Sequence, residues 1–551
     1  MLGDTNCWRG LWRRPMSRRQ ILRLASRTGI GLVGLSIVGC AAAPAPSTPS
    51  KAPTAPSPAT QATPQPVYGG TIVHAISSNM TLDSAFNVGG GYDQIALYHL
   101  YNTLLHVTPK ITLEPEMALS WEIPDKTTFI YKLRRGVKFH DGADFNAQAV
   151  KANFDRILDP DFKPTGPTEV RPNVKAVEVV DDATIKFTLK GPNSEFPGSA
   201  LASTYGGIVS PLAPARYNND LRRHGVGTGP FQSAEWVLDD HITVKKFPGY
   251  WDAGLPYLNQ ITWKIIPDPT VRRTLLLTGE AQFIMEMGQQ DIEALKADTN
   301  VKVVTQPGIK RNVVHFNMRK EPFSKKAARQ ALAYAVDRES ISQAVYGGTW
   351  KAAEGLFPPI SPFHDPTIKN YPFDLKKAQE KLAEAGYPSG FEFLAMVASA
   401  RPDEPQAAEI MKSQLAKVGV KMNIVVYDVP TYLQVWKTDV DKVDAIVTTA
   451  GHAMEPIRLI QNYYTKDGGY ANIKVDFPEL EALVAKAKET YDLEEQRRYL
   501  NQADKLITEN VWAEWAYVYD ATFFAYRKNV MNYVHGPHPY QARFRKVWLS
   551  K

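Results

Sequence analysis

The chain is poor in cysteine. Of its 551 residues only Cys7 and Cys40 are cysteines, and both lie within the first forty. This excludes a disulfide scaffold, and it excludes a thiolate metal site or a catalytic thiol in the body of the protein. Outside the N-terminus the sequence also lacks an apolar run long enough for a membrane-spanning helix. The remaining composition, 44% hydrophobic and 22% charged, is that of a globular protein too long for a single core.

The body of the chain has almost no net charge. The formal net charge is +7, but residues 1–39 hold seven arginines against one acid, which leaves about +1 for the rest. Such a balance gives no reason to expect nucleic acid as a partner. The sequence also lacks the H-E-x-x-H, G-x-S-x-G and G-K-[ST] motifs. We therefore expect a protein that is not an enzyme, with no catalytic residues, no metal site and no cofactor.

The first forty residues have the features of an export signal. Arg18-Arg19 lies in a basic segment, and the short apolar stretch 29–38 follows. Ile37-Val38-Gly39-Cys40 resembles the bacterial lipobox, in which the cysteine is lipidated and becomes the first mature residue. We predict a signal peptide at 1–39 and lipidation of Cys40. The twin-arginine and general secretion routes both stay open, as do Met1 and Met16 as the start.

A proline-rich segment follows the predicted lipidation site. Eight of residues 41–66 are proline, and Lys51 carries the only charge. Proline-rich chain is extended and semi-rigid, so a tether at 40–66 could hold the body up to roughly 80 Å from a membrane. The sequence thus predicts an extracytoplasmic protein anchored by lipid, in the periplasm or at the cell surface; it does not say to which leaflet.

Helical and strand patterns alternate along the body. A β-branched run predicts a strand at 71–76, and Asn146 and Asp374 are typical caps for helices at 147–157 and 375–385. Residues 512–524 are interpreted as a pair of buried strands. The mixture indicates α/β or α+β lobes.

Several motifs, in order, resemble one family. They are ALSWE at 118–122, LRRGVKFHDG at 133–142, GTGPF at 227–231 and RQALAYAVDR at 329–338. By these motifs the chain resembles family 5 extracellular solute-binding proteins, which are the peptide, nickel and oligosaccharide receptors of ABC importers. The resemblance covers about residues 68–530. Most of these residues fit turns and apolar anchors, so they indicate the fold more than the ligand.

The resemblance implies a two-lobed α/β fold like that of periplasmic binding proteins (class II, cluster C type), with an accessory α+β subdomain. Lobe I would comprise 67–110, 228–310 and 515–551. The accessory subdomain would be 111–227 and lobe II 311–514. A solute enclosed between lobes I and II by hinge closure would be delivered to an ABC permease and its ATPase by a monomeric receptor.

Six residues are candidates for contact with the ligand. Asp83 and Asn87 follow the first strand, where relatives carry a ligand-facing loop; an N-cap and turn is the alternative. Arg401 follows a predicted strand of lobe II and could meet a carboxylate, or it is solvated. Trp436 is assigned to core packing first and to stacking on a ligand second.

The last two candidates, His452 and Glu455, lie in a loop that departs from the family. Peptide-binding relatives carry an Asp in this stretch that pairs with the peptide ammonium, and here it is missing. We predict that no such carboxylate-to-ammonium pair holds the ligand, unless Glu455 replaces that Asp. An oligopeptide, an oligosaccharide, a metal chelate and an opine-like conjugate all stay open. A secreted hydrolase and a sensor or chaperone on the same scaffold are the alternatives of another class.

Overall fold

The computed structural model describes residues 65–86, 91–165, 169–287, 289–399, 401, 403–451, 455–465, 468, 476–536 and 540–551. Cys40, Asn87 and His452 therefore lie outside the described residues. None of the described helices is long and apolar enough to cross a membrane.

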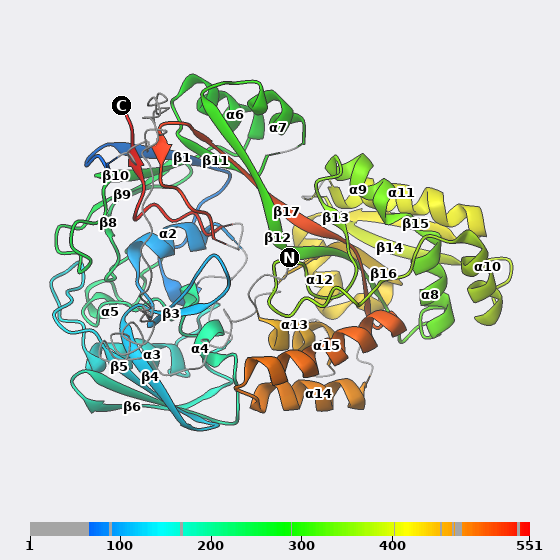
Figure 1. The fold of residues 1–551 in the computed structure, drawn as a ribbon, viewed down its shortest axis with the longest axis horizontal. Coiled ribbons are helices and arrows are strands. Elements are labelled where there is room, and N and C mark those ends of the chain that lie inside the picture. The colour runs from blue at the N-terminus through cyan, green and yellow to red at the C-terminus, as the bar shows by residue number, and fades with distance from the viewer. Residues whose placement is uncertain are drawn as a thin grey trace, which may run out of the picture.

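One sheet of 11 strands runs through most of the molecule (Figure 1). Its path is β15-β14-β16-β12-β17-β11-β1-β10-β9-β8, with β13 paired to β17. The two longest strands, β12 (Val301–Phe316) and β17 (Glu514–Arg527), are antiparallel neighbours in the middle of this path. They connect two bodies with separate hydrophobic cores, which we call the first lobe and the second lobe.

The first lobe has core residues within 72–101, 209–301 and 524–547. Parallel pairing of β1 with β10 and β11 forms its centre, and β8–β10 extend it as an antiparallel meander. Its elements are β1 (Thr71–Ile76), α2 (Asp93–Leu100), α5 (Ala213–Arg216), β8 (Phe231–Val237), β9 (His241–Lys246), β10 (Gln260–Ile265), α6 (Pro269–Thr278), β11 (Phe283–Met285), α7 (Gln289–Lys296), β18 (Val530–Met531) and β19 (Trp548–Leu549).

A small lobe, with core residues within 85–208, packs beside the first. Its antiparallel sheet has the order β4-β5-β7-β6, and α3 covers one face. The elements are η2 (Ser84–Phe86), β2 (Leu105–Val107), β3 (Leu113–Pro115), β4 (Ala118–Asp125), β5 (Thr128–Leu133), α3 (Ala147–Leu158), β6 (Val174–Asp181), β7 (Thr184–Leu189), α4 (Phe196–Ser199) and η3 (Thr204–Gly206). As predicted, Asn146 caps α3, accepting a hydrogen bond from the backbone N–H of Ala149.

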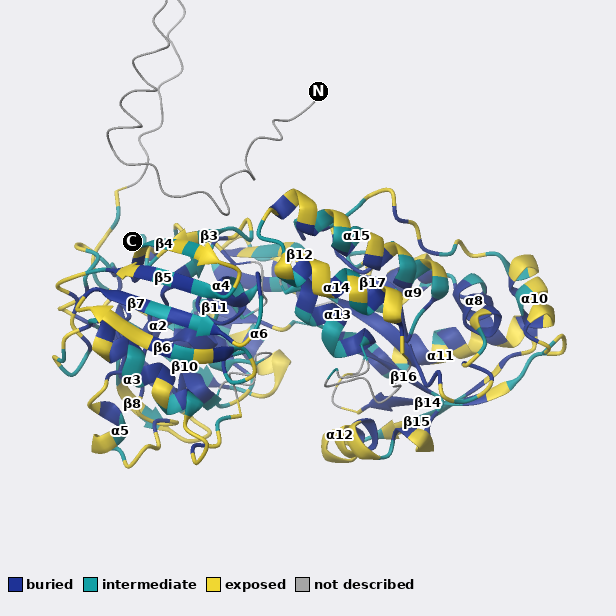
Figure 2. Cartoon of the chain, turned by 90° about the horizontal axis from the view of Figure 1, so that it is seen from below, coloured by how far each residue is buried: buried dark blue, intermediate teal, exposed yellow. Residues whose placement is uncertain are grey.

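The second lobe has core residues within 313–518. Figure 2 shows its buried strands behind helices whose outer sides are exposed. Its elements are α8 (Lys326–Ala335), α9 (Arg338–Tyr346), β13 (Lys351–Ala352), α10 (Leu375–Glu384), β14 (Glu392–Ala398), α11 (Asp403–Leu415), η4 (Ala416–Val418), β15 (Lys421–Tyr427), α12 (Val429–Thr438), η5 (Val440–Lys442), β16 (Ala445–Ala450), α13 (Pro456–Tyr464), α14 (Pro478–Glu489) and α15 (Leu493–Asn510). The predicted cap Asp374 accepts from Lys377 N–H at the start of α10.

The two connecting strands differ most from the sequence prediction. The strand pair expected at 512–524 is wrong, because β17 runs unbroken from 514 to 527. Its partner β12 carries an irregularity between Pro307 and Arg311. Pro307 has no N–H to donate, and Gly308 lies so close to Asp520 that a Cβ there would be 2.0 Å from its Oδ1. Ile309 lies within this irregular stretch and lines a cavity between the lobes.

Candidate ligand-binding site

A cavity lies where the three lobes meet, and we call it the interlobe cavity. The space between its walls, including solvent at the mouth, is about 1120 Å³. Gln94 and Tyr98 of α2 line it from the first lobe, and residues 194–205 from the small lobe. The second lobe and β12 contribute Ile309, Phe363 and Pro456. A cavity with walls from every lobe is the place where a ligand would couple their movements.

On one wall, the small lobe is fastened to the second lobe by Glu195. Its Oε1 accepts from the backbone N–H of Ile457 at 2.7 Å, and its Oε2 accepts from that of Arg458 at 3.0 Å. These N–H groups belong to the first turn of α13, where the helix dipole favours a carboxylate. Burial nonetheless raises the pKa of Glu195 to about 8, and Glu455 nearby acts in the same direction. The carboxyl therefore holds a proton more readily than an exposed glutamate does.

The predicted candidate Glu455 lies in the same wall and is already paired. Its Oε2 is 2.7 Å from Nη1 of Arg458, whose Nε is 2.9 Å from Oε1 of Glu169. The three side chains are each 13–16% exposed. Arg458 thus links the second lobe to Glu169 of the small lobe. Removing one partner would leave a charge unpaired in a largely buried place, so the contact between the lobes depends on the cluster being complete.

The connecting strands bring Lys310 and Asp520, whose charges attract each other, next to Ile309 of the cavity wall. The backbone N–H of Lys310 donates to Oδ1 of Asp520 at 2.7 Å. Burial raises the pKa of Asp520 to about 6 and lowers that of Lys310, although each group's charge favours ionisation of the other. The Lys310 ammonium also lies 5.5 Å from the ring centre of Tyr540 in the first lobe. Polar groups from both lobes therefore gather beside the irregularity in β12.

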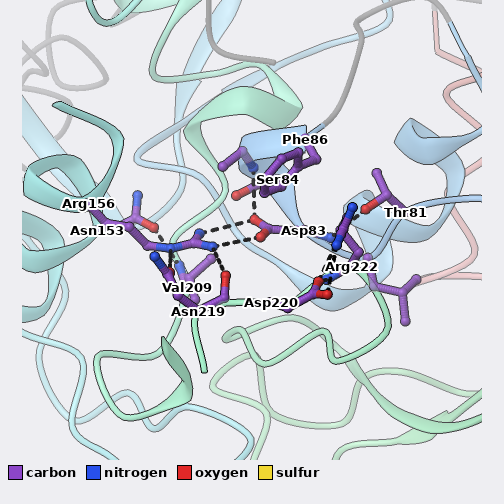
Figure 3. Close-up of polar contacts among 12 residues, drawn as sticks. Thr81, Asp83, Ser84, Phe86, Asn153, Arg156, Val209, Asn219, Asp220 and Arg222 are labelled. Carbon is purple, nitrogen blue, oxygen red and sulfur yellow. Dashed lines mark hydrogen bonds and ion pairs between the residues drawn. The ribbon is translucent and has the colours of Figure 1, made fainter. Parts of the chain in front are cut away.

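Asp83 points toward Arg156 (Figure 3) and does not line the interlobe cavity. Its side chain is fully buried, and its oxygens are 3.1 and 2.7 Å from Nη1 and Nη2 of Arg156 on α3. Oδ1 also accepts from Ala85 N–H at 3.0 Å. These contacts fit the N-cap-and-turn alternative, with an ion pair that joins η2 to α3. The predicted ligand contact has no support from this geometry.

Arg401 and Trp436 occupy the second lobe. The Arg401 side chain is half exposed and donates to Glu404 at 2.9 Å and to Thr448 at 3.2 Å. Its charge contributes to the lowered pKa of Lys310 on β12. Trp436 is buried on α12 beside His315 and Tyr432, as expected for core packing. Neither residue lines the interlobe cavity.

A second cavity adjoins the first and shares Tyr98, Val107, Thr204 and Gln541 with it. We call it the basic cavity, because its other wall residues include Arg543, Arg545, Lys546 and His106. Among the described residues no group of three or more His, Cys, Asp or Glu side chains could hold a metal ion.

Comparison with known proteins agrees with this architecture. The family described as bacterial extracellular solute-binding proteins, family 5 (middle), matches residues 112–472. The chain belongs to this family. The glutathione-binding protein GsiB of Salmonella choleraesuis is 32% identical over 463 residues, covering 80% of this chain and 88% of that protein.

Two solved structures share the mixed α/β fold. The periplasmic binding protein DppA of Helicobacter pylori, in complex with the peptide STSA, has a TM-score of 0.76 and 26% identity, covering 88% of this chain and 99% of that one. HbpA2 of Haemophilus parasuis has a TM-score of 0.78 and 26% identity, with 88% and 100% covered. The family and these relatives are binding proteins rather than enzymes, and family members act outside the cytoplasm.

Sequence reasoning missed most of the cavity wall. Glu195, Arg458 and Tyr98 come from three distant segments and belong to none of the family motifs. For the basic cavity, the run of basic residues 543, 545 and 546 near the C-terminus was a signal in the sequence.

Proposed function

We propose that this protein is the solute receptor of an ABC importer and that it binds a small peptide or a peptide-like molecule in the interlobe cavity. The observation that carries the proposal is a cavity walled by all three lobes of a family 5 binding protein. The ligands named for its relatives, glutathione for GsiB and a tetrapeptide for DppA, support this chemical class.

Hinge closure is the proposed mechanism. The first, small and second lobes would serve as lobe I (67–110, 228–310, 515–551), the accessory subdomain (111–227) and lobe II (311–514). A solute that touches both large lobes has more contacts in the closed state, so it shifts the population toward closure. Bending at β12 and β17 is favoured by the irregularity at Pro307, where the regular pairing is interrupted. The permease and ATPase would then receive the solute from the closed form.

Binding of a peptide ammonium, where the ligand has one, would not depend on Glu455. This carboxylate is neutralised by Arg458, as described above, and a second cation would compete with that pair. His452 stays the other candidate polar group of this loop. Two results together would contradict this part of the proposal: free peptides that bind wild type fail to bind once they are N-acetylated, and they also fail to bind Glu455→Gln.

Lipid anchoring at Cys40, after removal of 1–39, would place the body outside the cytoplasmic membrane at the end of a tether formed by 40–66. Cys40→Ser should move the protein from the membrane fraction to the soluble fraction. A variant that stays on the membrane with its mass changed only by the sulfur-to-oxygen exchange would contradict lipidation.

The ligand class is tested by calorimetry on the full chain in detergent, with reduced glutathione, dipeptides, tetrapeptides, an oligosaccharide and a nickel–histidine chelate. We expect binding of glutathione or a short peptide. At 100 times its dissociation constant such a ligand should add about 2.7 kcal/mol to the free energy of unfolding. Binding of the sugar or the chelate alone would redirect the proposal to a non-peptide solute. Products detected after incubation would instead indicate an enzyme.

A further inference from the structure

Arg543 in the basic cavity has an unusual set of neighbours. Its Nη1 donates to Nδ1 of His106 at 2.5 Å, and its guanidinium carbon lies 4.0 Å from the ring centre of Tyr98. Its Nε is buried without a hydrogen-bond partner. Among the described residues no carboxylate lies within ion-pair distance of it. Of the chain's acidic residues, only Asp4 and Asp467 fall outside the described segments.

The neighbouring acid, Glu116, attracts Arg543 through its charge but forms no ion pair with it. Glu116 is the one carboxylate that lines the basic cavity, and its oxygens accept from Asn102 Nδ2 at 2.9 Å and from Thr103 N and Oγ1 at 3.0 Å. It is also 3.6 Å from Nη1 of Arg545. With Arg543, Arg545 and Lys546 against Glu116, the wall carries an excess of two positive charges.

His106 does not supply the missing negative charge either. A guanidinium has only donors, so Nδ1 of His106 must accept the hydrogen bond, and the ring is neutral. Burial lowers the pKa of His106 to about 4, and the Arg543 charge acts in the same direction. A partly buried cation held by a neutral ring and an aromatic face lacks the counter-ion that most such groups have in folded proteins.

The backbone holds Arg543 firmly in this position. His99 on α2 accepts a hydrogen bond from Phe544 N–H at 3.0 Å through Nε2, and its Nδ1 donates to the Ile95 carbonyl at 2.6 Å. Both ring nitrogens are thus used to fasten the segment beside Arg543 to the core of the first lobe. A guanidinium fixed in this way loses less freedom when it binds a ligand.

The position of Tyr98 connects this cation to the interlobe cavity. Tyr98 lines both cavities, and its hydroxyl accepts from Nε2 of Gln541 at 2.9 Å. Because the two cavities share lining residues, a solute in the interlobe cavity lies next to the cavity that Arg543 lines.

We propose that the basic cavity is an oxyanion subsite, in which Arg543 binds the carboxylate end of a solute that occupies the interlobe cavity. The claim that Arg543 binds the carboxylate of the solute rests on the proposed function. The claim that the basic cavity binds oxyanions does not. Arg543 would offer the guanidinium N–H groups that His106 does not use, and a guanidinium matches carboxylate oxygens. Arg545 and Lys546 would raise the local concentration of anions.

The first experiment needs no knowledge of the solute. Thermal unfolding of the full chain is followed while sulfate, phosphate or acetate replaces chloride at constant ionic strength. Wild type and the control Arg319→Gln, which removes a surface arginine already paired with Asp441, should be stabilised by the oxyanions. Arg543→Gln should show a midpoint rise smaller by about 1–2 °C. Equal rises in all three proteins would overturn the proposal.

The second experiment compares acids with amides. Reduced glutathione and a dipeptide are titrated as free acids and as C-terminal amides into wild type, Arg543→Gln and Arg319→Gln. We expect Arg543→Gln to weaken the free acids at least about tenfold and to leave the dipeptide amide unchanged, because that amide has no carboxylate and so no charge-assisted contact to lose. The glutathione amide keeps its γ-glutamyl carboxylate, so its response shows which of the two carboxylates Arg543 binds. Equal losses for the dipeptide acid and its amide, or no loss, would overturn the subsite for the solute.

Failure of the proposed function gives a different result. If wild type binds none of these solutes while oxyanions still stabilise it through Arg543, then the peptide ligand is wrong and the anion subsite is supported. If the solutes bind and Arg543→Gln changes neither experiment, the receptor function is supported and the subsite is overturned.

Discussion

Two arginines, one in each cavity, have opposite surroundings. Arg458 in the interlobe cavity is shared by Glu169 and Glu455, at 2.9 and 2.7 Å, and thereby joins the small lobe to the second lobe. Arg543 in the basic cavity touches a neutral histidine and an aromatic ring. The same side chain therefore has a different role in each of the two adjoining cavities. A cation whose charge is satisfied internally holds the protein together, whereas one left without a carboxylate is available to a ligand.

The largest expected effect concerns Arg458. Arg458→Gln leaves Glu169 and Glu455 side by side without their shared cation, and it should lower the free energy of unfolding by about 3–5 kcal/mol, as removal of one partner from a buried pair does. Denaturant unfolding measures this. The control Arg319→Gln should lie within about 1 kcal/mol of wild type, because its ion pair is exposed. A loss no larger than that of the control would show that the cluster does not join the lobes.

The two surroundings should also respond oppositely to pH. Since the pKa of His106 is lowered to about 4 in the folded state, its contribution to stability is present above the ordinary histidine pKa of about 6.5 and is lost as the pH falls from there toward 4. Between pH 7 and 5 this should cost about 1–2 kcal/mol. Other buried histidines act in the same direction, so the test compares the free energy of unfolding of wild type and His106→Gln across this pH range. The variant should lose less stability on acidification. Identical pH profiles would contradict the neutral histidine beside Arg543.

Beside Arg458 the sign is reversed. The pKa of Glu195 is raised to about 8, so its contribution is present below the ordinary glutamate pKa and is lost as the pH rises from about 4.5 to 8. We expect about 3–4 kcal/mol less stability at pH 8 than at pH 5 from this group alone. Glu195→Gln keeps an oxygen that can accept from the first turn of α13 and should remove this dependence. A variant whose stability still falls by the same amount toward pH 8 would show that Glu195 is ionised throughout.

The smallest expected effect is that of Arg543 on stability. Arg543→Gln removes no ion pair, so the free energy of unfolding should change by less than about 1 kcal/mol. Denaturant unfolding beside Arg458→Gln makes the comparison direct. A loss as large as that of Arg458→Gln would mean that Arg543 has a structural role and would remove the contrast between the two cavities.

The sequence predicted the helices and strands that depend on a few adjacent residues. The helix caps Asn146 and Asp374 and the strand at 71–76 follow from a few adjacent residues, and the structure confirms them. The strand β12 was not predicted because Pro307 and Gly308 interrupt the alternation of apolar residues. Its pairing with β17 overrides this local break, since Asp520 accepts a hydrogen bond where the ladder is irregular.

The candidate site was less predictable, because it depends on contacts between distant segments. Arg543 meets His106 across 437 positions, and Glu195 meets α13 across more than 260. Nothing in the sequence near Asp83 indicates that Arg156 neutralises it, so a loop position that suits a ligand holds an internal ion pair instead. The ligand roles of Asn87, Arg401, Trp436, His452 and Glu455 stay predictions.

The measurement that tests the central claim most directly is ligand binding after the interlobe cavity is filled. Gly198 lines this cavity, and a Cβ there would meet only the Leu113 side chain, at 3.9 Å. Gly191, also in the small lobe, lies outside it, and a Cβ there would meet nothing within 4 Å. Glutathione and short peptides are titrated into wild type, Gly198→Phe and Gly191→Phe by calorimetry. The account predicts that Gly198→Phe stays folded and loses binding, while Gly191→Phe binds like wild type. Wild-type affinity in folded Gly198→Phe would contradict it.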